Sequence, residues 1–377
     1  MTSSAIKSLV APGVCDLQPY TPGKPIEALE REYGIRHAVK LASNENPLGP
    51  SPLGIAAARD VIDKVHYYPD GYALTAKLAA YHGLDSACFT LGNGSNDVLD
   101  MIARAFLTPE HNAVYSEHAF IVYAIATKAV GAASHIATAL PETDVMPYGH
   151  DLDAMYRLID DNTRVVFIAN PNNPTGTWLT KESLKDFIDS VPRHVIVVLD
   201  EAYIEYTAGR VFANGLEWLQ DSPNLVVTRT FSKIYGLAGL RCGYSISSPE
   251  IADYLNRVRH PFNVNNLALV AAEAALDDQD FLNESVRVNR EGMTQLTEAF
   301  SAMGLAVLPS AGNFLTVNVG PLAGDVYEGL LQKGVIVRPV ANYQLPNHLR
   351  ITIGRPNENQ QVIEALTAVL NNGHKGD

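Results

Sequence analysis

The sequence predicts an α/β protein. We expect a large domain, in which a mostly parallel sheet lies between helices, and a smaller α+β domain. Short β-branched runs alternate with helical patterns through the middle of the chain, which is typical of strand–helix–strand units. After about residue 265 the pattern changes to two helical segments, short strands and a last helix. We expect an N-terminal arm over residues 1–40 that joins the small domain, a large domain over 41–265 and a small domain over 266–377.

Three buried strands and one amphipathic helix are expected in the large domain. Arg164 to Ala169, Val195 to Leu199 and Leu225 to Thr228 are short apolar runs, as in strands covered on both faces. Thr180 can cap a helix between the first two strands. The apolar positions of this helix are spaced i, i+3, i+4 and i+7, and they are Leu184, Phe187, Ile188 and Val191.

The arm and the C-terminal third are expected to supply the remaining elements. Pro25 to Tyr33 is predicted to form a short helix in the arm. The other expected helices are Asn265 to Leu276, Phe281 to Met303 and Glu358 to Asn371, and the expected strands are Phe314 to Val319, Val335 to Arg338 and Leu349 to Ile353.

The composition narrows the possible partners and location. The chain has 377 residues, of which 47% are apolar, and its formal charge is −13, so nucleic acid and anionic membranes are not expected as partners. Any anionic substrate must then be bound by a local cluster of arginines. The three cysteines have no metal-binding spacing, and the histidines form no HExxH-like pattern, so no metal site is expected. This cysteine usage and the lack of a sustained apolar run predict a cytoplasmic protein.

Each of the three apolar runs stops at polar residues that could carry chemistry. The first leads into a loop that contains Asn173, the second into Asp200 and Tyr203, and the third into Thr230 to Lys233. The carboxyl ends of parallel strands lie on one edge of a sheet, where open α/β folds bind their ligands. We therefore expect these side chains to share one pocket.

Lys233 is the residue that best indicates the chemistry. An amine among small residues and hydroxyls, held at the dry end of a strand, can lose its proton near neutral pH and condense with an aldehyde. The hydroxyls of Thr230 and Ser232 and the guanidinium of Arg241 beside it can bind a phosphate. An aldehyde that carries a phosphate is pyridoxal phosphate (PLP). The alternative is a solvated surface lysine, and the rest of the chain has to decide between them.

Asp200 follows a buried strand, where a carboxylate is costly unless it is paired with a cation. The protonated ring nitrogen of PLP is such a cation, and keeping it protonated makes the ring an electron sink. Tyr203 could donate a hydrogen bond to the ring oxygen O3′, and Asn173 could contact that oxygen from the other side. For each residue alone, the alternatives are a helix-capping aspartate and a core tyrosine.

A second phosphate-binding element is expected around Gly94, Ser95 and Asn96. Glycines here lead into a helix whose first amides are unpaired and carry the positive end of the helix dipole, which is a favourable place for an anion. Phe120 could stack on a planar ring. A packed core aromatic is the alternative for Phe120.

Taken together, these residues resemble the fold-type I PLP-dependent aminotransferases and, within them, the histidinol-phosphate aminotransferase family. The resemblance spans nearly the whole chain. It rests on the segments Ser43 to Pro47, His66 to Gly71, Gly92 to Asp97, Asn170 to Gly176, Asp200 to Tyr203, Ser232-Lys233 with Gly239 to Arg241, Gly334 to Pro339 and Leu349 to Gly354.

The resemblance implies an aspartate aminotransferase-like fold and a role for each matching residue. Lys233 would hold the cofactor aldehyde covalently and later carry the substrate's Cα proton. Asp200 would pair with the pyridine nitrogen, while Asn173 and Tyr203 would contact O3′. The residues implied to bind the cofactor phosphate are Gly94, Ser95, Asn96, Thr230, Ser232 and Arg241.

Three further residues, Tyr68, Tyr20 and Asn44, have roles that only the resemblance implies. Tyr68 would reach the cofactor phosphate of a neighbouring subunit, so a homodimer with shared active sites is expected. Tyr20, in the arm, would close over the substrate, and Asn44 would lie on the substrate side. Phe120 stands where a tyrosine is common in the family, which keeps a stacking surface but removes a hydroxyl.

Two arginines are the expected substrate ligands. Arg350 matches the arginine that aminotransferases use for a carboxylate, and a guanidinium suits such a planar anion. Arg338 is a second cation from the same domain, or else part of a salt bridge. Two arginines favour a phosphorylated substrate or a keto dicarboxylate. The resemblance implies transamination between histidinol phosphate and 2-oxoglutarate, which gives imidazole acetol phosphate and glutamate in histidine biosynthesis.

Other functions remain open at this point. An aminotransferase for phenylalanine or tyrosine needs the same PLP site and Arg350. A PLP-dependent decarboxylase that acts on an amino acid phosphate shares much of the scaffold. A non-catalytic PLP-binding module of a DNA-binding regulator would carry an additional N-terminal domain, whereas about 40 residues precede the large domain here.

Overall fold

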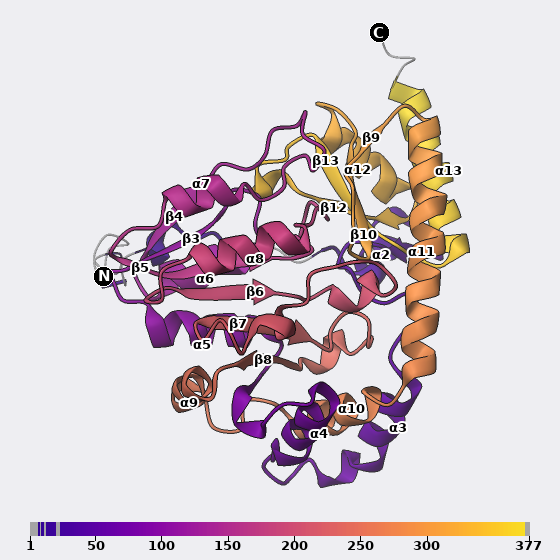
Figure 1. Ribbon diagram of the computed structural model, residues 1–377. Coiled ribbons are helices and arrows are strands. Elements are labelled where there is room, and N and C mark those ends of the chain that lie inside the picture. Colours follow the sequence, from indigo (N-terminus) through magenta and orange to yellow (C-terminus); the bar gives the residue numbers. More distant parts are fainter. Residues whose placement is uncertain (1–6, 8, 11–12, 20–22, 374–377) are drawn as a thin grey trace.

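The computed structural model describes residues 7, 9–10, 13–19 and 23–373 and contains a large sheet, a small sheet and the helices that cover them (Figure 1). In the large sheet, β8 runs antiparallel to both neighbours, and the pairs from β7 to β4 are all parallel. The strand order is β2 (Phe89–Gly92), β8 (Gly243–Ser247), β7 (Leu225–Thr230), β6 (Ile196–Asp200), β5 (Thr163–Ala169), β3 (Asn112–Ser116) and β4 (Ala133–Ala137).

Helices cover both faces of this sheet. The helices around the large sheet are α3 (Pro52–Asp60), α4 (Tyr72–His82), α5 (Ser95–Phe106), α6 (Ile121–Ala129), α7 (Leu152–Arg157), α8 (Lys181–Ser190), α9 (Pro249–Val258) and α10 (Asn266–Ala275). In β5, Val165 and Phe167 pack in the core cluster of α5, α6 and α9, whereas Val166 and Ile168 pack with α7 and α8. This alternation explains why the strand is apolar at nearly every position.

The smaller part of the molecule is an α+β layer. Its elements are α2 (Ile26–Tyr33), β1 (Val39–Lys40), α11 (Gln279–Ala302), β9 (Ala306–Val307), β10 (Phe314–Asn318), α12 (Ala323–Gln332), β11 (Val335–Ile336), β12 (Arg338–Pro339), β13 (His348–Thr352) and α13 (Pro356–Gly373). Strands β12, β13, β10 and β9 form an antiparallel sheet, and β1 pairs with β11. The long helix α11 extends from α10 along the edge of the molecule to α13 (Figure 1).

The remaining elements are short 3-10 helices, and one of them contributes a residue to the lining of the cavity described below. They are η1 (Val14–Asp16), η2 (Ile62–Lys64), η3 (Ser86–Cys88), η4 (Ile204–Thr207), η5 (Gly215–Trp218), η6 (Ala238–Leu240) and η7 (Ala341–Tyr343). Among the residues that are described, no helix is both long and apolar enough to cross a membrane.

Most of the expected elements are present. The hydroxyl of Thr180 accepts a hydrogen bond from the Ser183 amide at 3.1 Å, so the predicted N-cap of α8 is confirmed. The prediction of one continuous strand from Val335 to Arg338 is wrong. The chain changes pairing partner after Ile336, so β11 pairs with β1 and β12 pairs with β13.

The division into domains stays a prediction. The expected boundary near residue 265 falls just before α10. Helix α10 packs in one core cluster with residues of α3, α4, β2 and β8, which belong to the larger part. Its packing therefore favours a boundary further along the chain, within α11.

A buried ion pair links the ends of β6 and β7. Arg229 Nη2 lies 2.7 Å from Glu201 Oε2, and both side chains are buried. The amide of Gly215 donates to Glu201 Oε1 at 2.6 Å. Because side chains alternate along a strand, Arg229 points away from the face that Thr228 and Thr230 share. The pair thus fixes two strand ends from the side opposite the cavity described below.

Replacing this cation tests its contribution to the fold. Arg229→Leu leaves the Glu201 carboxylate buried without a counter-charge, and we expect it to lower the free energy of unfolding by about 3–5 kcal/mol. Urea titration measures the change. Arg257 pairs with Asp253 on the surface, so Arg257→Leu is the matched control and is expected to cost no more than about 1 kcal/mol. Equal losses in the two variants would contradict this role.

Candidate active site

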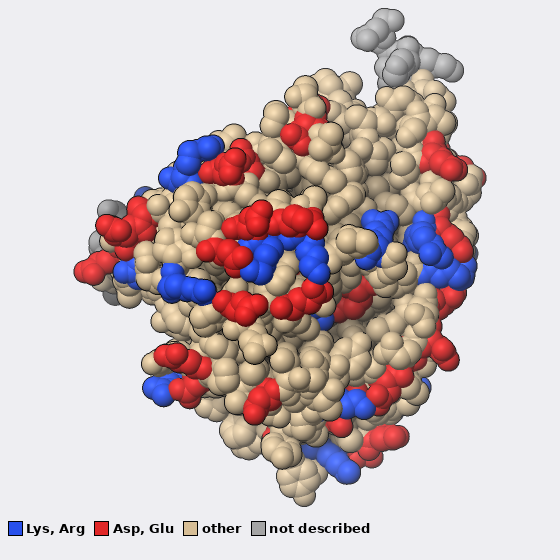
Figure 2. Space-filling model, viewed as in Figure 1, with Lys and Arg blue, Asp and Glu red and all other residues tan. Residues whose placement is uncertain are grey.

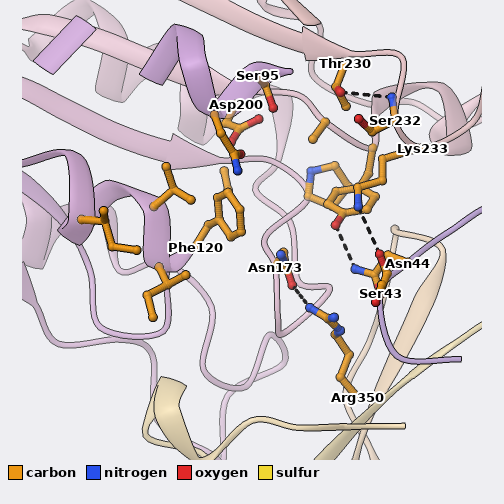
Figure 3. A pocket seen from close by; sticks show the side chains of 18 of the residues that line it. Ser43, Asn44, Ser95, Phe120, Asn173, Asp200, Thr230, Ser232, Lys233 and Arg350 are labelled. Carbon is orange, nitrogen blue, oxygen red and sulfur yellow. Dashed lines mark hydrogen bonds between the residues drawn. The ribbon is translucent and has the colours of Figure 1, made fainter. Parts of the chain in front are cut away.

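A cavity of about 490 Å³ lies at the carboxyl ends of β5, β6 and β7, and side chains of the small sheet line its other side. Figure 3 shows Lys233 and Ser232 on one side of this space and Phe120 on the other. Loops that follow different strands therefore meet at one place, as expected for the ligand site of an open α/β sheet. The residues predicted from the sequence that line it are Asn44, Ser95, Asn96, Phe120, Asn173, Asp200, Tyr203, Thr230, Ser232, Lys233, Arg241, Arg338 and Arg350.

Asp200 is the buried acid of the cavity. It occupies the last position of β6 and is 5% exposed. Its Oδ2 accepts a hydrogen bond from the Tyr123 hydroxyl at 2.9 Å, whereas Oδ1 has no hydrogen-bond partner within the described part of the chain. Burial raises the pKa of the Asp200 carboxyl, and the hydrogen bond from Tyr123 opposes this only in part. A cation beside Oδ1 would favour the charged form.

Tyr123 is a site residue that the sequence motifs do not indicate. It lies in α6, is fully buried and stacks on Phe167 with ring centroids 4.8 Å apart. Burial and the neighbouring Asp200 carboxylate raise the pKa of the Tyr123 hydroxyl. This hydroxyl therefore stays protonated and donates a hydrogen bond to Asp200. The available signal is spacing, because Tyr123 follows the predicted stacking residue Phe120 by three positions.

Lys233 lies on the opposite side of the cavity from Phe120. Its Nζ donates to the carbonyl oxygen of Ser43 at 3.3 Å and lies 5.6 Å from the centre of the Tyr203 ring. The hydroxyl of Tyr203 in turn accepts a hydrogen bond from Asn44 Nδ2 at 2.9 Å (Figure 3). A carbonyl and an aromatic face thus both contribute to orienting the amine at the cavity.

Polar groups around the start of α5 form a cup for an anion. Gly94 is the N-cap of α5 with φ +81°, and an added Cβ there would lie 2.4 Å from Arg241 Nη2. Arg241 Nη1 donates to the hydroxyl of Ser232 at 3.4 Å, and Thr230 Oγ1 accepts from the Ser232 amide at 3.1 Å. Only glycine lets the guanidinium come this close to the helix N-terminus, where the unpaired amides of α5 favour a negative charge.

The two expected substrate arginines are neighbours across a strand pair. Arg338 in β12 and Arg350 in β13 are register partners, so their side chains leave the sheet on the same face. Arg350 donates from Nη1 to Asn173 Oδ1 (Figure 3) and from Nη2 to the carbonyl oxygen of Ala42 at 2.7 Å. Arg350 thus connects the small sheet to the loop that follows β5.

Two predicted site residues that the structure describes, Tyr68 and Gly94, do not line this cavity. Tyr20 lies outside the described residues. Tyr68 is 80% exposed and stacks on Phe262, with ring centroids 4.4 Å apart, away from the cavity of its own chain. Gly94 lies behind the lining, against Arg241. Lining residues for which the sequence predicted no individual role are Ser43, Asp100, Ile121, Val122, Ile125, Ala169, Pro171, Ala202 and Tyr343.

The sequence matches the family model for aminotransferase class I and II over residues 36–366. The chain belongs to this family. As a member of the class I and II aminotransferases, it is a PLP-dependent transaminase. The orphaned Asp200 Oδ1, the amine of Lys233 and the anion cup at α5 suit the ring nitrogen, the aldehyde and the phosphate of PLP, respectively. The residues of this cavity therefore fit PLP, the cofactor of the class I and II aminotransferases.

Close relatives of this aminotransferase share one name. Histidinol-phosphate aminotransferase 2 of Pseudomonas fluorescens (strain Pf0-1) is 56% identical, and the match covers 97% of this chain and 98% of the relative. Histidinol-phosphate aminotransferase 1 of Nitrosococcus oceani is 52% identical over 98% of this chain and 99% of that protein. Among solved structures, histidinol-phosphate aminotransferase from Sinorhizobium meliloti in complex with pyridoxal-5′-phosphate superimposes with a TM-score of 0.85 at 30% identity, over 95% of this chain and 96% of that one.

The face of the molecule that Figure 2 shows has no single sign of charge. Lys and Arg side chains lie next to Asp and Glu side chains over this face. With a formal charge of −13 on the whole chain, the long-range field does not favour anions. Local cations such as Arg338 and Arg350 therefore have to provide any attraction for an anionic substrate.

Proposed function

We propose that the protein transfers the amino group of L-histidinol phosphate to 2-oxoglutarate, forming imidazole acetol phosphate and glutamate in histidine biosynthesis. The observation that carries this proposal is the pair of cations, Arg338 and Arg350, on one face of the small sheet and in the same cavity as Lys233. The near full-length relatives named histidinol-phosphate aminotransferase support it.

The two arginines suit the charges of both substrates. A phosphate dianion has more charge and more acceptor oxygens than a carboxylate, and two guanidiniums can share it. The second carboxylate of 2-oxoglutarate can use the same pair in the other half of the reaction. Neutral side chains alone would not compensate for removing such a dianion from water.

Each site residue predicted from the sequence has a proposed task. PLP bound here supplies an electron sink next to the substrate's Cα. Lys233 holds the cofactor and, once released, moves the proton at Cα. Asp200 keeps the ring nitrogen charged, and Asn173 and Tyr203 orient the ring through O3′. The proposed phosphate ligands are Gly94, Ser95, Asn96, Thr230, Ser232 and Arg241. Phe120 is the proposed stacking residue, and Asn44 is a proposed substrate contact. Tyr20, which the structure does not describe, is proposed to close over the substrate.

A half-reaction assay tests the proposed substrate. The PLP-loaded protein is mixed with histidinol phosphate or phenylalanine, and the absorbance of the cofactor and the released products are followed. We expect conversion to the pyridoxamine form with histidinol phosphate at a concentration at least about 10-fold below that needed for phenylalanine, because the extra charge contributes about 1.4 kcal/mol or more. Lys233→Ala is expected to show no conversion.

Other outcomes of this assay identify the rival functions. Preference for phenylalanine or tyrosine would show an aromatic amino acid aminotransferase. Release of carbon dioxide from an amino acid phosphate would show a decarboxylase. A Lys233→Ala variant with full turnover would contradict the assignment of this lysine.

We also propose that the protein is a homodimer in which Tyr68 contributes to the partner's active site. Tyr68, Tyr72 and Phe262 are 80%, 79% and 56% exposed, so a surface of large aromatic rings faces outward on the single chain. Such a surface is typical of a protein–protein contact. A second copy of the chain that covers these rings would bring Tyr68 to an anion cup of the other subunit.

Mixing two inactive variants tests this arrangement. Tyr68→Ala and Lys233→Ala are each expected to have low activity. In a mixed dimer, one site combines the intact lysine with the partner's intact tyrosine, so an equal mixture is expected to regain about a quarter of the wild-type activity. Tyr72→Ala, which also removes an exposed ring, is the control for Tyr68→Ala and is expected to stay active. No recovery on mixing would show that Tyr68 serves its own subunit or no site.

We further propose that the protein works in the cytoplasm. Cys15, Cys88 and Cys242 are free, and this usage suits a reducing compartment. A disulfide in the protein isolated from its native cells would contradict this location.

A further inference from the structure

The loop after Arg338 forms one wall of the cavity. It contains η7, and Tyr343 at the end of η7 lines the cavity and is 5% exposed. Val340, Tyr343 and Leu345 form a small core cluster, against which Ile121 of α6 packs. In the sequence, the wall follows a strand of the small sheet. In the structure, it packs against α6 of the larger part of the molecule.

His118 makes a hydrogen bond to this wall. Its Nδ1 lies 2.7 Å from the carbonyl oxygen of Tyr343, and the residue is 5% exposed. A carbonyl oxygen can only accept, so Nδ1 carries the hydrogen. The carbonyl belongs to the last residue of η7, and Gln344 then turns the chain in the left-handed region with φ +61°. Carbonyls at helix ends lack an intrahelical partner, and a buried one needs a donor from elsewhere.

The backbone of His118 is fixed on the opposite side. Its carbonyl oxygen accepts a hydrogen bond from Asn172 Nδ2 at 3.1 Å. The residue after Asn172, Asn173, accepts the hydrogen bond from Arg350. Phe120, the proposed stacking residue, follows His118 by two positions. His118 thus lies between the loop after β5, the stacking ring and the wall with Tyr343.

Aromatic contacts hold the plane of the His118 ring. Tyr148 meets it edge-on, with ring centroids 5.3 Å apart and planes at 88°. Tyr148 contacts His348 in the same way, at 5.5 Å and 83°. His348 precedes Arg350 by two positions in β13. These contacts restrict the direction in which Nδ1 can donate.

We propose that His118 is a positioning residue for the amino donor. Its Nδ1–H fixes the carbonyl of Tyr343, and thereby sets the distance between the stacking ring Phe120 and the wall that follows Arg338. His118 acts through Tyr343, and it governs the binding of the donor more than that of the cofactor. The inference rests on the proposed function, because it assumes that the donor lies between these two surfaces.

Three substitutions distinguish the effect of the N–H donor from the effect of the size of the ring. His118→Asn retains an N–H at nearly the position of Nδ1, since both nitrogens are bonded to Cγ. His118→Gln moves the N–H toward the position of Nε2, and His118→Leu removes it. We expect His118→Leu and His118→Gln to raise KM for histidinol phosphate about 10-fold with kcat within about 2-fold, and His118→Asn to stay within about 2-fold of wild type in both constants.

Cofactor affinity and thermal unfolding are measured on the same proteins, with exposed His194→Leu as the control. All variants are expected to bind PLP as tightly as wild type. Equal KM values for the Asn and Leu variants, or a loss of PLP affinity as large as the rise in KM, would overturn the inference. If the Leu variant does not fold, the Asn and Gln variants still decide it. If wild type does not convert histidinol phosphate, the proposed function fails instead, and the same variants are compared with the amino donor that wild type does accept.

Discussion

The buried carboxylate of Asp200 is the constraint on which the site depends. It lies at the end of a central strand. One of its oxygens accepts a hydrogen bond from Tyr123, and the other has no hydrogen-bond partner among the described residues. Such a group is unfavourable unless a cation is placed against it. The protonated ring nitrogen of PLP meets that need. Binding the cofactor therefore relieves an electrostatic cost that the fold creates, and the carboxylate in return keeps the ring cationic.

The two layers of the molecule meet around this acid. Lys233 contacts the carbonyl of Ser43, Arg350 contacts Asn173, and His118 contacts the carbonyl of Tyr343. Each of these bonds joins the loops of the large sheet to a segment that packs with the small sheet or leads into it. The geometry of the donor site is consequently a property of how the layers pack, and small changes in that packing alter distances between reacting groups.

Much of the fold and of the cofactor site follows from local sequence, whereas the remaining features depend on contacts between distant segments. The buried strands end at Ala169, Asp200 and Thr230, and parallel pairing of β5, β6 and β7 brings these ends together. By contrast, the pairing of Arg338 with Arg350 requires the register of β12 and β13. Tyr123 resembles any core tyrosine until the fold places it beside Asp200, and the bond from His118 to Tyr343 spans 225 positions. Short-range signals can be found in one sequence, but these long-range contacts cannot.

Nitrogen NMR of the protein loaded with PLP labelled at the ring nitrogen tests the central claim most directly. The chemical shift of this nitrogen reports whether it is protonated. We predict a protonated nitrogen at neutral and mildly alkaline pH in the wild type, and an unprotonated one in Asp200→Asn, in which the charge is removed and the shape is kept. An unprotonated nitrogen in the wild type, or the same shift in both proteins, would contradict the pairing of Asp200 with the cofactor.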